Sequence, residues 1–143
     1  MKLRSLLYGM VFAVVVISVL LLILGVGFHR PVSLQGTALY NAANEVMVKG
    51  VVQEVQEFDC PVSEGELGTH LMLKTTDGVL QVHLAPVRVM AGQKINFAPG
   101  DEIQVVGAKV RIQGKNGLIA REVTRGNEMF VFRDSVGKLM MVQ

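Results

Sequence analysis

Four side chains in the middle of the sequence can act as metal ligands, and they belong to Cys60, His70, Met72 and His83. A thiolate, two imidazoles and a thioether form a ligand set that suits copper. His70, Met72 and His83 flank the dipeptide Asp77-Gly78, a strong signal for a two-residue hairpin turn between alternating apolar runs. The sequence therefore predicts a copper site if this hairpin brings the ligands together.

The register of the hairpin decides whether the ligands meet. With Asp77-Gly78 as the turn, Met72 lies opposite His83, and His70 lies diagonal to His83, on the face away from the aliphatic core. Direct cross-strand neighbours are about 5 Å apart and diagonal neighbours about 7–8 Å apart. Cys60 precedes the hairpin, in a loop that can fold over the three side chains.

A plainer interpretation stays open for the same residues. His70 and His83 can be ordinary half-exposed strand residues, and Cys60 can be a small buried apolar side chain, as free cysteines often are. A three-residue bulged turn at Asp77-Gly78 would shift the register and separate the ligands. Because Cys60 is the only cysteine, it cannot form a disulfide within the chain, although it could pair with another chain.

The loop at residues 59–69 is the predicted contact site for a ligand or a protein partner. Its glycines allow close backbone approach, and an acidic loop can dock against a basic surface. The residues expected to make these contacts are Cys60, Glu64, Glu66, His70 and His83. If the loop is purely structural, the basic strands around Arg121 and Arg125 are the next surface to consider.

The sequence lacks the motifs that would indicate an enzyme. It contains no Gly-x-Ser-x-Gly, no His-Glu-x-x-His and no phosphate-binding P-loop, and Cys60 has no histidine close to it in sequence. Paired carboxylates occur at Glu64 and Glu66 and at Asp101 and Glu102, on loops and turns where such groups are usually solvated. We expect no catalytic activity and no cofactor, apart from copper at the site above.

The N-terminal segment predicts a membrane anchor. Residues 6–28 contain no charged residue and no proline, and this length suffices to cross the roughly 30 Å hydrocarbon core as a helix. A cleaved signal peptide is the alternative, with Gly25 and Gly27 as small residues, but its apolar region is usually only about 7–15 residues long. Lys2 and Arg4 favour a cytoplasmic N-terminus, which places the rest of the chain in the periplasm of a bacterium.

These features predict three parts: an uncleaved anchor at residues 1–28, a linker at residues 29–44, and an extracytoplasmic β domain at residues 45–143. The third part alternates apolar and polar residues in five or six short strands, with bulged glycines and a short helix at residues 85–93. This pattern is typical of a small Greek-key barrel of the OB type, with an open sandwich as the alternative. The predicted core comprises Val48, Val52, Leu71, Leu73, Val82, Leu84, Ile103, Val105, Val110 and Ile112.

Charge argues against nucleic acid as the partner. The chain has 14 basic and 12 acidic residues, and Lys2 and Arg4 account for the difference, so the part of the chain after residue 28 is neutral. A nucleic-acid-binding domain would carry a concentrated basic face and stacking aromatics. A protein complex, and membrane lipid around the anchor, are the expected partners.

Three runs of the sequence resemble a group of small secreted or membrane-anchored bacterial OB-fold-like proteins without an assigned activity. These runs are VQEFDCPVSEGELGTHLMLKTTDG, VHLAP and FAPGDEIQVVGAKV. The architecture is also similar to the cytochrome c maturation haem chaperone. That family attaches haem through a histidine followed four residues later by a tyrosine, and His29, His70 and His83 lack this tyrosine. Together these observations predict a non-catalytic accessory module of a membrane or periplasmic complex, with a periplasmic copper carrier as the alternative.

Overall fold

A computed structural model describes residues 8, 10–17, 39–63 and 65–140. The chain divides into two units, Met1–Val32 and Ser33–Gln143. In the first unit, residues 10–17 are helical. Within the described residues, no helix combines the length and the apolar composition that crossing a bilayer requires. Most of the predicted span at residues 6–28 lies outside the described residues, as does most of the predicted linker.

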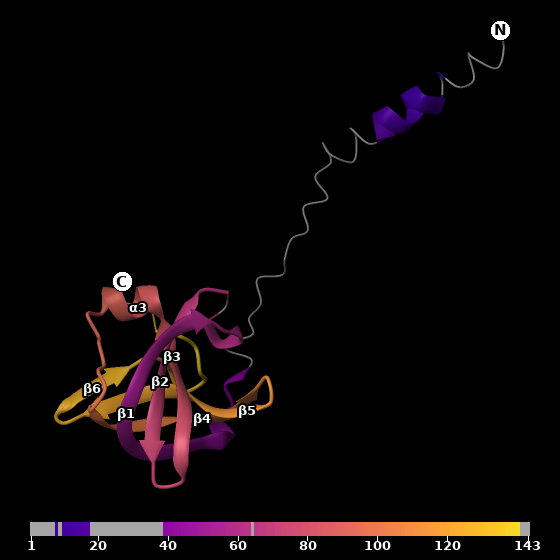
Figure 1. The fold of residues 1–143 in the computed structure, drawn as a ribbon. Coiled ribbons are helices and arrows are strands. Elements are labelled where there is room, and N and C mark those ends of the chain that lie inside the picture. Colours follow the sequence, from indigo (N-terminus) through magenta and orange to yellow (C-terminus); the bar gives the residue numbers. More distant parts are fainter. Residues whose placement is uncertain (1–7, 9, 18–38, 64, 141–143) are drawn as a thin grey trace. The chain divides into compact units, whose positions relative to one another are not determined.

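The second unit is built from β-strands (Figure 1). Its strands are β1 (Glu45–Asp59), β2 (Leu67–Thr75), β3 (Gly78–Pro86), β4 (Glu102–Ile112), β5 (Lys115–Arg125) and β6 (Glu128–Val131). Its described helical segments are the 3₁₀ turns η1 (Ala42–Asn44) and η2 (Pro61–Ser63) and the helix α3 (Val87–Gly92). The short helix predicted at residues 85–93 is therefore present, and it begins after Pro86.

The strands close into a barrel. Their order is β3-β2-β1-β4-β5-β6, and β3 also pairs with β5 in parallel at residues 81–83. The first five strands therefore form a closed ring, with α3 between β3 and β4, which is the arrangement of an OB-type barrel. This confirms the predicted OB-like fold, and the ring closure distinguishes it from an open sandwich.

Strand β1 is long enough to join both halves of the barrel. Its first half pairs with β4 and its second half with β2, and the register shifts between Val52 and Glu54. Gly50 precedes this bulge, and a Cβ atom there would lie 2.4 Å from the carbonyl oxygen of Lys74. The bend predicted from the glycine and the broken alternation therefore has a steric basis.

The hairpin formed by β2 and β3 has a different register from the predicted one. Thr75 pairs with Gly78, so the turn residues are Thr76 and Asp77. The side-chain hydroxyl of Thr75 donates to the carbonyl of Gly78 and accepts from the amide of Asp77, which stabilises this turn. The change shifts each cross-strand partner by two positions, so every side chain keeps its predicted face.

The predicted core is largely confirmed. Seven of its ten members are buried, namely Val52, Leu71, Leu73, Val82, Leu84, Ile103 and Val105. The other three, Val48, Val110 and Ile112, are partly buried against the two clusters of the interior. The second cluster contains Tyr40, Cys60, Val62, Ala108 and Ile119, so the chain before β1 and the loop after it both pack on the barrel.

We expect Leu73→Ala to lower the free energy of unfolding by about 2–5 kcal/mol, because it leaves a cavity in a fully buried position. Urea unfolding of the full-length chain measures this change. Val79→Ala is the matched control, since Val79 is 55% exposed on the neighbouring strand, and it should cost less than about 0.5 kcal/mol. Equal effects of the two substitutions would contradict the described packing.

Candidate metal centre

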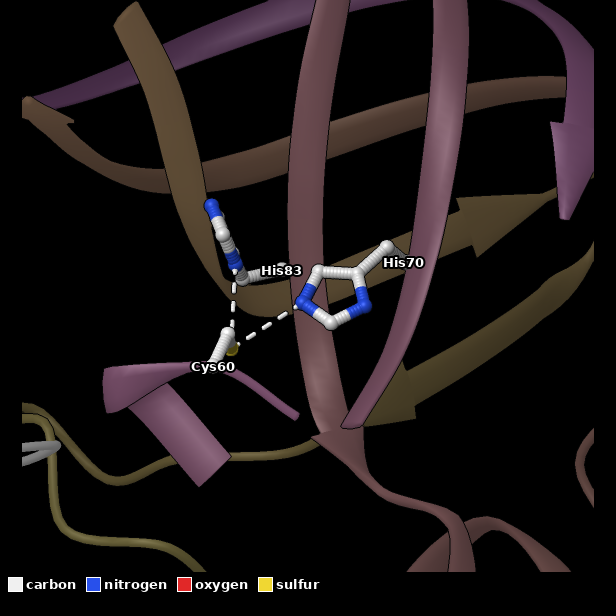
Figure 2. A group of neighbouring side chains, drawn as sticks. All are labelled: Cys60, His70 and His83. Carbon is white, nitrogen blue, oxygen red and sulfur yellow. Dashed lines mark hydrogen bonds between the residues drawn. The ribbon is translucent and has the colours of Figure 1, made fainter. Parts of the chain in front are cut away.

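The cysteine of the candidate site lies where β1 ends and η2 begins. Pro61 follows it and fixes the backbone for a tight turn, which the amide of Ser63 closes by donating to the carbonyl of Cys60. The turn packs Val62 into the second apolar cluster and leaves Cys60 only 6% exposed. The loop therefore holds the buried thiol so that it faces His70 and His83 (Figure 2).

The two histidines come from neighbouring strands. His70 on β2 pairs directly with His83 on β3, and their rings meet edge to face with centroids 4.7 Å apart. Nε2 of His70 lies 3.1 Å from Sγ of Cys60, and Nδ1 of His83 lies 3.6 Å from it (Figure 2). All three potential ligand atoms are within 4.8 Å of one another.

This spacing fits a bound metal ion. An ion about 2.0–2.3 Å from three ligand atoms in a plane holds those atoms about 3.5–4 Å apart. Side-chain shifts of less than about 1 Å would convert the observed sulfur–nitrogen distances to this spacing. The cluster of Cys60, His70 and His83 is the one group of three such ligands found among the described residues.

Both imidazoles are held in the form that binds metals. Burial lowers the pKa of His70 to about 4, and it lowers the pKa of His83 to about 3 with added repulsion from His70 and Arg133. Backbone groups of Gly68 and Gln56 partly oppose this lowering of the pKa of His70. Nδ1 of the His70 ring makes no hydrogen bond. At neutral pH each ring is uncharged and has a lone pair available for a metal.

Three further side chains shape the environment of the site. The ring of Phe58 stacks on His70, with centroids 3.8 Å apart and planes 8° apart. The hydroxyl of Ser63 lies 3.1 Å from the sulfur of Cys60. The buried guanidinium of Arg133 donates to the carbonyls of Leu84 and Ala120 and lines the same small pocket as the two histidines.

The structure therefore brings together three of the four predicted ligands. Met72 pairs with Gln81, because the two-position shift of the hairpin places His70, rather than Met72, opposite His83. The alternative interpretation of the two histidines as half-exposed strand residues is wrong, since His70 is 1% and His83 4% exposed. The loop that carries Cys60 lies against them, as the metal-site hypothesis requires.

Of the two predicted acidic contacts, only Glu66 belongs to the described residues. Glu66 forms a 2.6 Å ion pair with Arg88, and both side chains are about half exposed. Glu64 lies outside the described residues. Sequence reasoning missed Phe58, Ser63 and Arg133. The position of Ser63 three residues after Cys60 was a possible signal, but nothing in the sequence relates Arg133 to the histidines.

Comparison with known proteins gives a family. The profile of the MamS/MamX magnetosome protein family matches residues 44–130, well over half of the chain. The chain belongs to this family. The part matched to MamS/MamX contains Cys60, His70 and His83, and it ends before Arg133. No curated protein sequence matched the chain. These comparisons do not show the resemblance to the haem chaperone.

Two solved structures are similar to the chain at low identity. One is the Stn1-ten1 complex of S. pombe, at 16% identity and a TM-score of 0.45, with 59% of each chain covered. The other is the dimeric N-terminal domain of PriB from Thermoanaerobacter tencongensis, at 18% identity and a TM-score of 0.45, with 60% of this chain and 99% of that one covered.

Proposed function

We propose that this protein is a non-catalytic accessory protein of the magnetosome that holds one copper ion between Cys60, His70 and His83. Membership of the MamS/MamX family supports the setting. The observation that supports metal binding is the convergence of three ligand atoms within 4.8 Å at a buried position, with both imidazoles neutral. Structural cysteines do not need such partners, because an apolar neighbourhood alone accommodates a thiol.

The non-catalytic part of the proposal rests on how the reactive groups are enclosed. A catalytic metal keeps a coordination position open to water or substrate. Here the aromatic ring of Phe58 covers His70, and Cys60 packs with the apolar residues of the second cluster. An ion at this position would be stored or handed on, rather than exposed to a substrate.

The membrane anchor and the periplasmic location belong to the same proposal. The uncharged run at residues 6–28 supports them, since its length matches the bilayer core. Anchoring would confine the barrel to the membrane plane and raise its effective concentration near a membrane-bound complex. A C-terminal reporter fusion should be active only as an exported protein, whereas a mature N-terminus near residue 28 would overturn the anchor.

Metal content tests the central part of the proposal. Full-length chain is loaded with copper under reducing conditions and desalted, and copper is then measured by elemental analysis. We expect about one copper per chain, and the same value for Met72→Leu, because Met72 pairs with Gln81 and not with His83. Failure to retain copper would overturn the metal-binding function, and a loss confined to Met72→Leu would show that the ligand set is wrong.

A docking role for the loop after η2 is the second candidate. Leu67, which follows this loop as the first residue of β2, is 55% exposed, and its neighbour Glu66 forms an exposed ion pair with Arg88, so an apolar contact is flanked by charges. Such a surface would gain association rate and specificity from a complementary partner. Glu66→Lys should then reduce the size of the solubilised native complex on gel filtration while copper retention stays at the wild-type level.

A further inference from the structure

The side chains of the Cys60, His70 and His83 cluster form the ligand set of a copper site that carries electrons. One thiolate and two imidazoles around the ion are typical of copper proteins that transfer electrons, in which any axial ligand binds only weakly. Nε2 of His70 and Nδ1 of His83 lie 3.1 Å and 3.6 Å from the sulfur, and the three ligand atoms lie within 4.8 Å of one another. The make-up of the cluster therefore indicates a function beyond holding the ion.

The elements that carry the ligands leave them little freedom to move. His70 and His83 are directly paired residues of the β2–β3 hairpin, within the closed barrel. Cys60 begins the tight turn that the amide of Ser63 closes. Gly68 lets this turn pack closely, since a Cβ atom there would lie 2.0 Å from the hydroxyl oxygen of Ser63 and 3.1 Å from Cε1 of His70. A set held in this way resists the tetragonal arrangement that divalent copper prefers, so both oxidation states would share one geometry.

Ser63 acts on the electron density of the sulfur. Its hydroxyl lies 3.1 Å from Sγ of Cys60, and its side chain belongs to a residue only 4% exposed. Once the thiol has lost its proton, the hydroxyl is the donor of this hydrogen bond. Such a bond withdraws electron density from the thiolate and favours the reduced ion, and hydrogen bonding at this sulfur is known to tune the potential of such sites.

Phe58 connects the buried cluster with the surface. Its ring stacks on the imidazole of His70, with centroids 3.8 Å apart and planes 8° apart. His70 is 1% exposed, whereas Phe58 is half-buried near the end of β1. An electron can pass from the ion through a ligand imidazole to an aromatic ring in van der Waals contact with it, while the ion itself stays covered. The stacked rings therefore offer a route between the cluster and a redox partner at the surface.

We propose that the cluster of Cys60, His70 and His83 is a one-electron copper site that exchanges its electron through the stacked rings of His70 and Phe58. In the oxidising step, monovalent copper becomes divalent and gives one electron to an outer-sphere acceptor of the redox-protein class, which is reduced by that electron. The copper–sulfur bond and the two copper–nitrogen bonds persist, so no ligand leaves and no proton is transferred. This inference rests on the proposed copper binding and adds electron transfer to it.

Oxidation of the copper-loaded full-length chain tests the proposal. The chain is loaded with monovalent copper, desalted, analysed for copper and titrated anaerobically with ferricyanide. We expect one equivalent of ferricyanide to produce an intense visible absorption from thiolate-to-copper charge transfer, ascorbate to reverse it, and the copper content to stay constant. Failure to retain copper before oxidation would overturn copper binding and electron transfer together. Retained copper that is released on oxidation, or that gives no such absorption, would overturn electron transfer alone.

Phe58→Leu tests the route of the electron. It should slow the reduction of the oxidised site by hexaammineruthenium in stopped-flow measurements, while the copper content and the visible spectrum stay at wild-type values. Phe58→Tyr keeps the ring and should retain the wild-type rate. Phe130→Leu is the matched control, because this half-buried ring packs against Phe97 rather than against a ligand. An unchanged rate in Phe58→Leu would overturn the route, and Phe58→Ile, which suits a strand, replaces this variant if it does not fold.

Ser63→Ala tests the hydrogen bond to the sulfur. Without the hydroxyl the thiolate is richer in electrons and stabilises divalent copper, so the reduction potential should shift downward. A redox titration followed by the visible absorption measures this shift. An unchanged or higher potential would overturn the role of Ser63.

Discussion

Cys60→Ser is expected to reduce the affinity for monovalent copper by at least about a thousandfold, a loss of more than about 4 kcal/mol of binding free energy. The thiolate is the single anionic ligand of the cluster, and a serine hydroxyl stays protonated at neutral pH. The variant should still fold, because the hydroxyl has Ser63 and the two histidines as hydrogen-bonding neighbours. A bicinchoninate competition titration measures the change.

Ser63→Ala is the matched control for this substitution. It removes a hydroxyl 3.1 Å from the same sulfur but leaves all three ligand atoms in place. We expect its copper affinity to stay within about tenfold of the wild type, the size of effect that groups outside the ligand set typically have. Copper affinity of Cys60→Ser within tenfold of the wild type would place the binding site elsewhere.

The metal-free protein is expected to lose about 4 kcal/mol of stability between pH 7 and pH 5, about 2 kcal/mol from each buried histidine. The pKa values of His70 and His83 are lowered in the fold to about 4 and about 3, whereas both rings titrate near 6.5 when unfolded. As pH falls through 6.5, the unfolded chain takes up protons that the folded chain does not, so unfolding becomes more favourable. The loss continues until the pH reaches the folded pKa values.

Denaturant unfolding at a series of pH values measures this dependence. The pKa values of Glu45 and Asp101 are also lowered in the fold, mainly by hydrogen bonds. The stability that these two carboxylates contribute is lost below about pH 4.5. The change in stability above pH 5 therefore comes from the two histidines. His70→Gln should roughly halve the loss between pH 7 and pH 5, and Glu66→Gln at the exposed ion pair should leave it unchanged. A pH-independent free energy across this window would contradict the burial of the two rings.

The sequence predicted the barrel well where local signals and the global fold agree. The fourth strand, Glu102–Ile112, shows the alternation of apolar and polar residues from which strands were predicted, with a register shift beside Gly107 where the alternation slips. A Cβ atom at Gly107 would lie 2.3 Å from the carbonyl oxygen of Ile119, so the glycine is required by close backbone approach. Alternation and glycine position are local features, and they specify this strand without knowledge of its partners.

Several features of the candidate site could not be predicted from local sequence patterns. The Asp-Gly rule misplaced the turn because the Thr75 hydroxyl stabilises a turn at Thr76-Asp77, and this difference places His70, rather than Met72, opposite His83. The burial of His70 and His83 arises from the loop that folds over them, which is a tertiary contact with no periodic signal in the sequence. Arg133 reaches the site from beyond β6, about fifty residues after His83, and its position there follows only from the closed barrel.

X-ray absorption at the copper edge, measured on the full-length chain loaded with one equivalent of monovalent copper, tests the central claim most directly. The account predicts three-coordinate copper with one sulfur at about 2.2–2.3 Å and two imidazole nitrogens at about 2.0 Å. A shell without sulfur would exclude Cys60 as a ligand and contradict the account. A shell with two sulfur atoms would contradict it as well, because it would require Met72 or a second chain to bind the ion.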